Sequence, residues 1–355
     1  MTRFMRNFLI VNCLAALVLV TGCGRDDKLP RKQASPELDA AFAAYLQAKD
    51  EAGQDIHSIM ILQHGKVLEE KWMSEGQPDS AHIMNSVSKT FTAMAVGLAI
   101  AEGRLSLEDK VVDFFPDKVP ENASDTLRSV TVRNLLTMNC GHGSDPTFAA
   151  RQGDKDWVAV FLEWPITHEP GTYYCYNTIG TYVLSEIVQK VTGEKVNDYL
   201  EPRLWDPLGI EKPYWEESPT GANCGGWGLY LKTEDMAKMG QLLLQEGKWK
   251  GRRILPAEWV REASSNLVWS VPHMLTPELC ERIGMTKENS DWLQGYGYQM
   301  WRCRHNAYRA DGANGQYIIV LPDQDAVIAM TANLRDMQGE INLVWDYILP
   351  ALKNE

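Results

Sequence analysis

The stretch Ile83-Met84-Asn85-Ser86-Val87-Ser88-Lys89-Thr90-Phe91 opens an apolar run that ends at Gly103. Within this run, apolar side chains recur at the spacing of a buried helical face, at Phe91, Met94, Ala95, Leu98 and Ala99. Glycine commonly ends a helix. The pattern therefore predicts a central helix that begins near Ser86, with Lys89 one turn further along on the same face.

Ser86 and Lys89 together have the chemistry of an activated nucleophile. A serine hydroxyl is a poor nucleophile until a neighbouring base takes its proton, and a lysine whose pKa is lowered by burial can be that base. The free N–H groups at the start of a helix favour the oxyanion that forms when a carbonyl is attacked. One Ser-x-x-Lys pattern is expected by chance in roughly every chain of this composition, so other motifs must support this interpretation.

The composition is that of a globular protein with a sizeable core. The chain has 355 residues, of which 45% are hydrophobic and 23% are charged, and its formal net charge is −12. A nucleic-acid-binding surface needs an excess of Lys and Arg, so we do not expect nucleic acid as a partner.

Residues 1–22 are typical of a secretory signal peptide. Arg3 and Arg6 provide a basic start, and the apolar run over residues 8–20 is shorter than the roughly 20 residues that span a bilayer. Val20-Thr21-Gly22-Cys23 resembles a bacterial lipobox, which implies cleavage before Cys23 and its lipidation. An ordinary signal peptide cut nearby, or an uncleaved anchor, is the alternative.

The lipobox implies a place in the bacterial cell envelope. We expect residues 23–35 to form a flexible tether, because they carry charges, prolines and few apolar side chains. The lipid would anchor the protein to the outer or the cytoplasmic membrane, with the folded domain outside the cytoplasm.

Export makes the cysteine count informative. Beyond Cys23 the chain has cysteines at positions 140, 175, 224, 280 and 303. Their number is odd, so at least one is unpaired in a monomer, whatever the pairing of the others. The chain has no CxxC pair, and its histidines lack the HExxH spacing of a metal-binding helix. We therefore predict no metal and no cofactor.

Both ends of the chain predict strands. Residues 36–49 have an amphipathic helical pattern, and two β-rich runs, 58–63 and 67–72, flank a His64-Gly65 turn. Near the C-terminus, the pattern predicts strands over residues 295–301, 307–310, 316–321 and 326–332 and a helix over 340–352.

We expect an α+β fold, with an antiparallel sheet flanked by helices and a large helical insertion. The domain over residues 36–355 would comprise an α/β lobe, about 36–82 plus 281–355, and a helical lobe, about 83–280, with the cleft between the lobes. Within the helical lobe, residues 202–219 are rich in Pro and Trp and are predicted to be an irregular surface segment.

Residues 138–146 form a predicted loop that contains His142 and Asp145. These two side chains could build a Ser-His-Asp triad with Ser86. Since no spacing supports such a triad, we expect His142 to line the cleft instead.

Two further segments are candidates for the site. Tyr176 follows a Pro-Gly turn and precedes a predicted helix over 179–191. Beside a lysine, this tyrosine could carry a proton, provided that positive charge lowers its pKa. Residues 223–228, with Trp227, are a glycine-rich turn without the GxxxxGK[ST] spacing of a phosphate loop, and we expect them to border the substrate cleft.

Four segments, in order, resemble the serine β-lactamase and penicillin-binding-protein superfamily, in particular its class C-like branch of esterases, D-aminopeptidases and nylon-oligomer hydrolases. They are Ser86-Val87-Ser88-Lys89, Leu135-Leu136-Thr137-Met138 running into Gly141, Pro170-Gly171-Thr172 leading to Tyr176, and Asp311-Gly312-Ala313-Asn314-Gly315-Gln316. The similarity extends from about residue 36 to the end of the chain. It implies the fold of that family and a serine hydrolase that forms an acyl-enzyme.

The resemblance also implies a role for each matching residue. Ser86 is the implied nucleophile, Lys89 its base partner and Tyr176 the proton shuttle to the leaving group. The backbone N–H groups of Ser86 and Ala313 are the implied oxyanion hole. The residues expected to line the substrate cleft are Asn177, His142, Trp227, Asp311, Gly312 and Gln316.

The chain departs from the family's motifs at two places. Asn177 directly follows Tyr176, whereas the family has an asparagine two places after its tyrosine. Where the family's third motif has Lys or His, this chain has Ala310, followed by Asp311. A substrate carboxylate would lack its cation and would be repelled by Asp311. We therefore expect a small neutral ester or amide, or one that bears an amine.

Two other functions remain open from the sequence. The protein could be a β-lactamase or D,D-peptidase, in which case penicillin would form a covalent adduct on Ser86. It could also be a non-catalytic envelope binding module, because the displaced Asn177 leaves the chemistry incomplete. Labelling by a fluorophosphonate probe would argue against the binding module.

Overall fold

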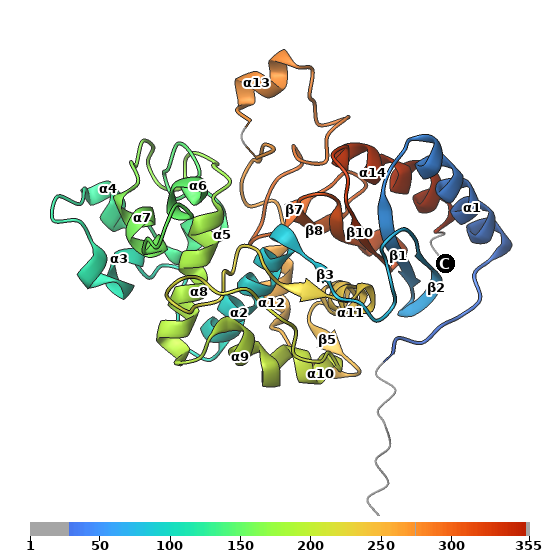
Figure 1. Cartoon of the computed structure of the whole chain (residues 1–355), viewed down its shortest axis with the longest axis horizontal. Coiled ribbons are helices and arrows are strands. Elements are labelled where there is room, and N and C mark those ends of the chain that lie inside the picture. The colour runs from blue at the N-terminus through green and yellow to red at the C-terminus, as the bar shows by residue number, and fades with distance from the viewer. Residues whose placement is uncertain (1–27, 274, 353–355) are drawn as a thin grey trace, which may run out of the picture.

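The computed structural model describes residues 28–273 and 275–352. The predicted signal peptide and Cys23 lie outside these residues. A six-stranded antiparallel sheet has the order β2-β1-β10-β9-β8-β7 (Figure 1). Its strands are β1 (Ile56–Gln63), β2 (Lys66–Trp72), β7 (Trp301–Arg302), β8 (Tyr308–Gly312), β9 (Gln316–Leu321) and β10 (Ala326–Ala332).

The N-terminal hairpin and the C-terminal strands form one sheet, as predicted. β1 pairs with β10 along most of its length, for example at Ile59 and Met330. His64 and Gly65 join β1 to β2 with φ angles of 51° and 71°, the conformation that a tight hairpin turn requires. Pairing of the first strand with the last joins the two ends of the domain in one sheet.

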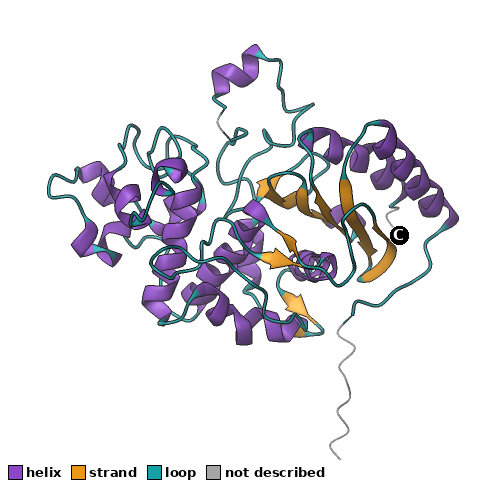
Figure 2. Ribbon diagram, viewed as in Figure 1, coloured by secondary structure: helices purple, strands orange, loops and turns teal. Residues whose placement is uncertain are grey.

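Helices cover both faces of the sheet (Figure 2). One face packs against α1 (Pro36–Glu51), α14 (Met337–Leu343) and the helical turns η5 (Val344–Ile348) and η6 (Leu349–Ala351). The other face packs against α11 (Thr233–Leu244). Alternate residues of β1 enter the two cores, Ile59 and Ile61 on the α1 side and Met60 and Leu62 on the α11 side. This double coverage explains why the strands are continuously apolar.

The central helix is α2 (Ser88–Ala101), and it follows a 3-10 turn, η1 (Asn85–Val87). Ser86 therefore lies in the 3-10 turn rather than in the α-helix itself. Every residue from Ser88 to Ala99 is buried, not only one face, because other elements surround the helix. Its close neighbours are α8 (Thr178–Thr192) and Trp259, whose ring leaves no room for a side chain at Gly97.

The remaining elements are short. The helices are α3 (Val111–Phe114), α4 (Asp125–Ser129), α5 (Val132–Leu136), α6 (Thr147–Ala150), α7 (Trp157–Glu163), α9 (Val196–Leu200), α10 (Asp206–Leu208), α12 (Ala257–Ala263) and α13 (Pro277–Arg282). Short strands pair as β3 (His82–Ile83) with β4 (Tyr230–Leu231), and as β5 (Lys248–Trp249) with β6 (Arg252–Arg253). Figure 1 shows α13 projecting from the body of the molecule.

The structure corrects three predicted elements. Residues 295–301 are mostly loop, because positive φ angles at Gly295 and Gln299 interrupt an extended chain, and only Trp301 continues into β7. Residues 201–208 are helical, and the indole of Trp205 is fully buried, so this part is not an irregular surface segment. α11 was predicted to belong to the helical lobe, but it packs on the sheet.

The predicted tether is fixed from residue 29 onward. Leu29 is buried, and Lys32 N donates to Val67 O on β2 at 2.9 Å. Arg31 forms ion pairs with Glu70 at 2.9 Å and Glu234 at 2.8 Å. A flexible tether over residues 23–35 is therefore wrong for residues 29–32, because they extend the edge of the sheet.

Among the helices of the described residues, none is long and apolar enough to cross a membrane. All five described cysteines are free thiols, and four of them are buried. The odd cysteine count required only one of them to be free.

Candidate active site

The start of α2 places Lys89 against Ser86. Lys89 Nζ donates hydrogen bonds to Ser86 Oγ at 3.0 Å and to the carbonyl oxygen of Gly226 at 2.7 Å. The lysine is 1% exposed. Burial lowers its pKa from 10.5 to about 7, against the opposing charges of Asp145 and Asp311. A large share of Lys89 is therefore a neutral amine near pH 7, as a base for the serine proton requires.

Gly226 belongs to the glycine-rich turn over residues 223–228. A Cβ at Gly226 would lie 2.8 Å from Thr178 Cγ2 and 3.4 Å from Lys89 Nζ, so only glycine fits there. The turn passes beneath Lys89 and orients its amine through a carbonyl. The turn therefore supports the lysine. Its Trp227 does not face the site but packs against Trp157, with ring centroids 5.3 Å apart.

Tyr176 lies on the other side of the serine, in the loop before α8. Ser86 lies near enough to its hydroxyl to lower the pKa of the phenol, and Lys89 Nζ lies 5.0 Å from the centre of its ring. The ring stacks on Trp301 at 5.7 Å. Burial raises the pKa of Tyr176, although positive charge was expected to lower it. Tyr176 therefore remains a protonated phenol near neutral pH, and Lys89 is the better base.

The end of β8 comes unusually close to the serine. A Cβ at Gly312 would lie 2.3 Å from the carbonyl oxygen of Met84, so a larger residue would push the strand away. Asn85 Nδ2 donates to Ala313 O at 2.8 Å and ties the two segments together. The backbone of Ala313 consequently lies beside Ser86, as the two donors of an oxyanion hole must.

Asp311 is neutralised by a residue that the sequence interpretation overlooked. Arg309 Nε donates to Asp311 Oδ2 at 2.8 Å, and Arg309 is fully buried beneath the cleft. Burial raises the pKa of Asp311, and Arg309 opposes that shift. Whether ionised and paired or protonated, Asp311 presents no isolated negative charge. The expected repulsion of substrate carboxylates by Asp311 is therefore wrong.

Two cavities meet at Tyr176. The α14-side cavity, of about 690 Å³, is lined by Ser86 and Ala313 and by residues of the loop before α14. The α6-side cavity, of about 790 Å³, is lined by Asp145 and by residues of α6. Both cavities share Tyr176, Thr178, Pro272 and His273. A substrate whose carbonyl lies at Ser86 therefore has room on two sides.

Asn177 and His142 line neither cavity, although both were expected in the cleft. Asn177 is buried and caps α8, where its Oδ1 accepts from Gly180 N at 2.8 Å. Its Nδ2 lies 2.9 Å from His142 Nδ1. Burial lowers the pKa of His142 to about 4, and its ring packs on Phe161. The pair braces the start of α8, and no Ser-His-Asp triad forms.

Gly312 and Gln316 also lie behind the cleft and are not part of its lining. Gly312 permits the close approach of β8, and Gln316 Nε2 donates to Ala332 O at 2.6 Å, which ties β9 to β10. Of the six expected cleft residues, Asp311 alone is among the residues that line the two cavities.

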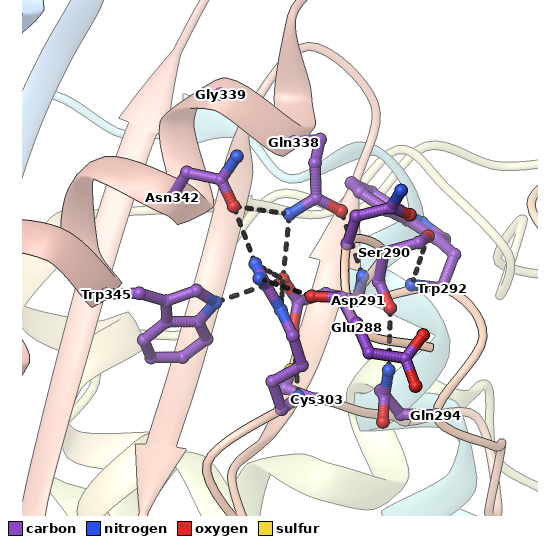
Figure 3. A network of polar contacts seen from close by, with 12 residues as sticks. Glu288, Ser290, Asp291, Trp292, Gln294, Cys303, Gln338, Gly339, Asn342 and Trp345 are labelled. Carbon is purple, nitrogen blue, oxygen red and sulfur yellow. Dashed lines mark hydrogen bonds and ion pairs between the residues drawn. The ribbon is translucent and has the colours of Figure 1, made fainter. Parts of the chain in front are cut away.

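A buried network holds one wall of the α14-side cavity. Asp291 accepts hydrogen bonds from Arg304 Nη2 at 2.8 Å, Gln338 Nε2 at 2.8 Å and Trp345 Nε1 at 3.0 Å (Figure 3). Burial alone would raise the pKa of Asp291, but Arg304 and Arg309 hold it at about 2. The carboxylate thus anchors the wall residue Trp292, its chain neighbour, to α14 and η5.

Among the described residues there is no group of three or more His, Cys, Asp or Glu side chains that could hold a metal ion.

Comparison with known proteins gives the family. The family model described as Beta-lactamase matches residues 38–353. The chain belongs to the β-lactamase family. This member is 25% identical over 301 residues to a 6-aminohexanoate-dimer hydrolase of Paenarthrobacter ureafaciens, with 79% of this chain and 73% of that protein covered.

This β-lactamase-family chain is also 26% identical over 295 residues to penicillin-binding protein 4 of Amycolatopsis lactamdurans, with 72% of each protein covered. Among solved structures, EstCE1, a hydrolase with promiscuous acyltransferase activity, has a TM-score of 0.68 at 17% identity, covering 88% of this chain and 98% of that one. That likeness bears out the predicted fold class.

Proposed function

We propose that this protein is a serine hydrolase that cleaves an ester or amide of a small substrate through an acyl-enzyme on Ser86. The observation that carries the proposal is the buried Lys89 amine, 3.0 Å from Ser86 Oγ and with a pKa of about 7. The relatives support it, since one is named a 6-aminohexanoate-dimer hydrolase and a structural neighbour is described as a hydrolase with promiscuous acyltransferase activity.

In the proposed reaction, Ser86 Oγ attacks the substrate carbonyl carbon while neutral Lys89 takes the hydroxyl proton. The backbone N–H groups of Ser86 and Ala313 stabilise the oxyanion. The bond to the leaving oxygen or nitrogen then breaks, and that atom receives a proton from Tyr176, which Lys89 reprotonates. Water attacks the acyl carbon, its proton returns to Ser86 Oγ through the same groups, and a carboxylic acid is released.

Mass spectrometry tests the nucleophile directly. After incubation with a fluorophosphonate, we expect one covalent adduct, mapped to the peptide that contains Ser86. Ser86→Ala should carry no adduct and should lose hydrolysis of p-nitrophenyl butyrate, whereas Ser129→Ala, a change on the exposed surface of α4, should keep both. Wild-type hydrolysis by Ser86→Ala would refute the mechanism, and a penicilloyl adduct on Ser86 would extend the activity to β-lactams.

We also propose that the enzyme is exported and held in the bacterial cell envelope by a lipid on Cys23. The lipobox-like sequence over residues 20–23 supports this proposal. In a bacterial host, we expect the wild type in the membrane fraction with a mass that includes acyl chains. Cys23→Ser should lose that added mass, and a wild type without it would refute the lipid anchor.

A further inference from the structure

The first part of the described chain lies on one edge of the sheet and is held there. Leu29 is buried, and its backbone N donates to Glu234 Oε1 at 2.6 Å. Val67 N on β2 donates to the carbonyl oxygen of Pro30 at 2.8 Å, and Arg31 pairs with Val67 as a β-bridge. The chain therefore joins the body of the protein at a fixed point, beside β2 and the start of α11.

The turn that carries Ala313 lies far from this point of attachment. β2 and β8 are four strand spacings apart in the sheet, and a spacing is about 4.8 Å, which gives about 19 Å across the sheet. The strand pairing puts Val67 level with Tyr308 of β8. Ala313 follows Tyr308 by five residues, or about 16 Å along the strand. Together the two offsets amount to about 25 Å.

Both cavities have their mouths on the far side of the molecule from this point. Ile283, at the end of α13, lines the α14-side cavity and is 55% exposed. Phe148, on α6, lines the α6-side cavity and is 79% exposed. Figure 1 shows α6 and α13 toward the upper end of the view, whereas the described chain enters the body at the lower end. A molecule held at Leu29 therefore presents these mouths in the opposite direction.

The proposed lipid on Cys23 would hold Leu29 close to a membrane. Five residues, 24–28, separate Cys23 from Leu29. Even a fully extended chain advances by only about 3.5 Å per residue, so Leu29 lies within about 21 Å of the lipidated residue. A domain of this length has a radius of gyration of about 20 Å and is about 50 Å across. The connection is therefore too short for the body to turn its far side to the bilayer.

We infer that the protein rests on the membrane through the surface beside Leu29 and holds its catalytic cleft open to the aqueous space of the cell envelope. We call this surface the anchor face, and its hollow is lined by residues that include Lys28, Trp72, Pro78, Asp79 and Glu234. The chain has a formal net charge of −12, so the covalent lipid rather than attraction to anionic lipids sets this contact.

The consequence concerns the side from which substrate arrives. Esters or amides dissolved in the aqueous space reach Ser86, whereas lipids of the bilayer that holds the enzyme do not. This orientation rests on the proposed lipid anchor, and its effect on turnover rests on the proposed hydrolase activity.

Energy transfer measures the orientation. The lipidated protein is added to preformed vesicles of phosphatidylethanolamine and phosphatidylglycerol in which some headgroups carry an acceptor dye. A donor dye is attached to Gln77→Cys, an exposed position next to the anchor face, or to Glu278→Cys, an exposed position on α13. Wild-type protein treated with the same dye gives the background from its native thiols. Transfer from position 77 should exceed transfer from position 278 at least about twofold, because α13 projects at the far end of a body about 50 Å across.

Turnover tests the consequence for substrate. A fluorogenic butyrate ester is offered either free in solution or attached to a lipid headgroup of the vesicle that carries the enzyme. A variant with about thirty Gly and Ser residues inserted between Asp27 and Lys28 has a linker with an end-to-end distance of about 30 Å, which lets the cleft reach the bilayer. The insertion should raise the ratio of attached-ester to free-ester cleavage about tenfold over the wild type and leave free-ester cleavage unchanged. The same insert appended after Glu355 is the matched control and should keep the wild-type ratio.

Each way of failing has its own result. Equal energy transfer from both positions, stronger transfer from position 278, or a ratio that the linker leaves unchanged would overturn the inferred orientation. A wild type without acyl chains on Cys23 refutes the lipid anchor and, with it, the orientation. An enzyme that takes no fluorophosphonate label and cleaves neither form of the ester refutes the proposed hydrolase, while energy transfer still decides the orientation.

Discussion

Replacement of Lys89 by methionine should stabilise the fold at neutral pH while it abolishes turnover. Lys89 is 1% exposed, and burial lowers its pKa from 10.5 to about 7. Near and below pH 7 the folded protein therefore buries a charge that the unfolded chain keeps hydrated. The penalty amounts to about 4 kcal/mol at pH 7, at about 1.4 kcal/mol for each tenfold difference in proton affinity.

Methionine has a similar length and no charge, so it avoids this penalty. It also leaves the carbonyl of Gly226, now 2.7 Å from Lys89 Nζ, without a donor. An unsatisfied buried carbonyl costs about 1–3 kcal/mol, so the net gain at pH 7 is about 1–3 kcal/mol. The wild type binds fewer protons folded than unfolded between about pH 7 and 10.5, so its penalty declines over that range and the two proteins become equally stable near about pH 9.

Urea unfolding followed by tryptophan fluorescence, at several values between about pH 6 and 9.5, measures this difference. Lys238→Met is the matched control, because Lys238 is 4% exposed but pairs with Asp235 at 3.3 Å. Loss of the lysine leaves the carboxylate of Asp235 largely buried and without its cation, so Lys238→Met should destabilise the fold at each pH. A wild type that is more stable than Lys89→Met at about pH 6–7, or a difference that does not change with pH, would refute the reasoning.

Three further predictions concern the site. The single-turnover acylation rate of the wild type should rise with pH and level off above about pH 7, because the neutral Lys89 amine is the base; a rate that falls over this range would contradict that role. Gly312→Ala should lower kcat for p-nitrophenyl butyrate by about tenfold or more, since the added Cβ would lie 2.3 Å from the carbonyl oxygen of Met84 and displace the turn that carries Ala313. An unchanged kcat would show that catalysis does not need the close approach of β8 to Met84. Asp291→Asn should cost about 3–5 kcal/mol in urea unfolding near pH 7, because it leaves the partly buried Arg304 without its carboxylate and removes a negative charge near the buried Arg309. The pKa of Asp291 is lowered from its usual 3.8 to about 2 in the fold, so about 2 kcal/mol of that difference should be present above about pH 4 and should be lost as the pH falls through about 2. A difference that shrinks already near pH 6 would exclude this cause.

Local patterns in the sequence predicted most of the elements that carry the site. The β-rich runs of β1 and β2, the apolar runs of β9 and β10, and the helical spacing of α1 and α8 are properties of neighbouring residues, so they can be recognised without knowledge of the fold. The three-residue spacing of Ser86 and Lys89 likewise fixes their proximity in any helical turn. The order of the motifs along the chain then identified the fold class.

Predictions about charge and cleft lining were less successful, because both depend on residues that are distant in sequence. Asn177 was expected in the cleft beside Tyr176 but caps α8, since the start of a helix needs an acceptor for its free N–H groups. The pairing of Asp311 with Arg309 could have been inferred, because alternate residues of a strand share one face.

The sequence by itself determined that a serine and a lysine would meet at the start of a buried helix. Only the tertiary structure decided what that pair faces. The pKa of Lys89 depends on burial among α2, the turn at Gly226 and the cleft, and the charge of each cavity depends on which carboxylates lie beside a cation. Asp311 is paired with Arg309, whereas Asp145 has no cation within ion-pair distance in the described part of the chain. An electrostatic field is a sum over all neighbours in space, and the order of residues along a chain does not contain that sum.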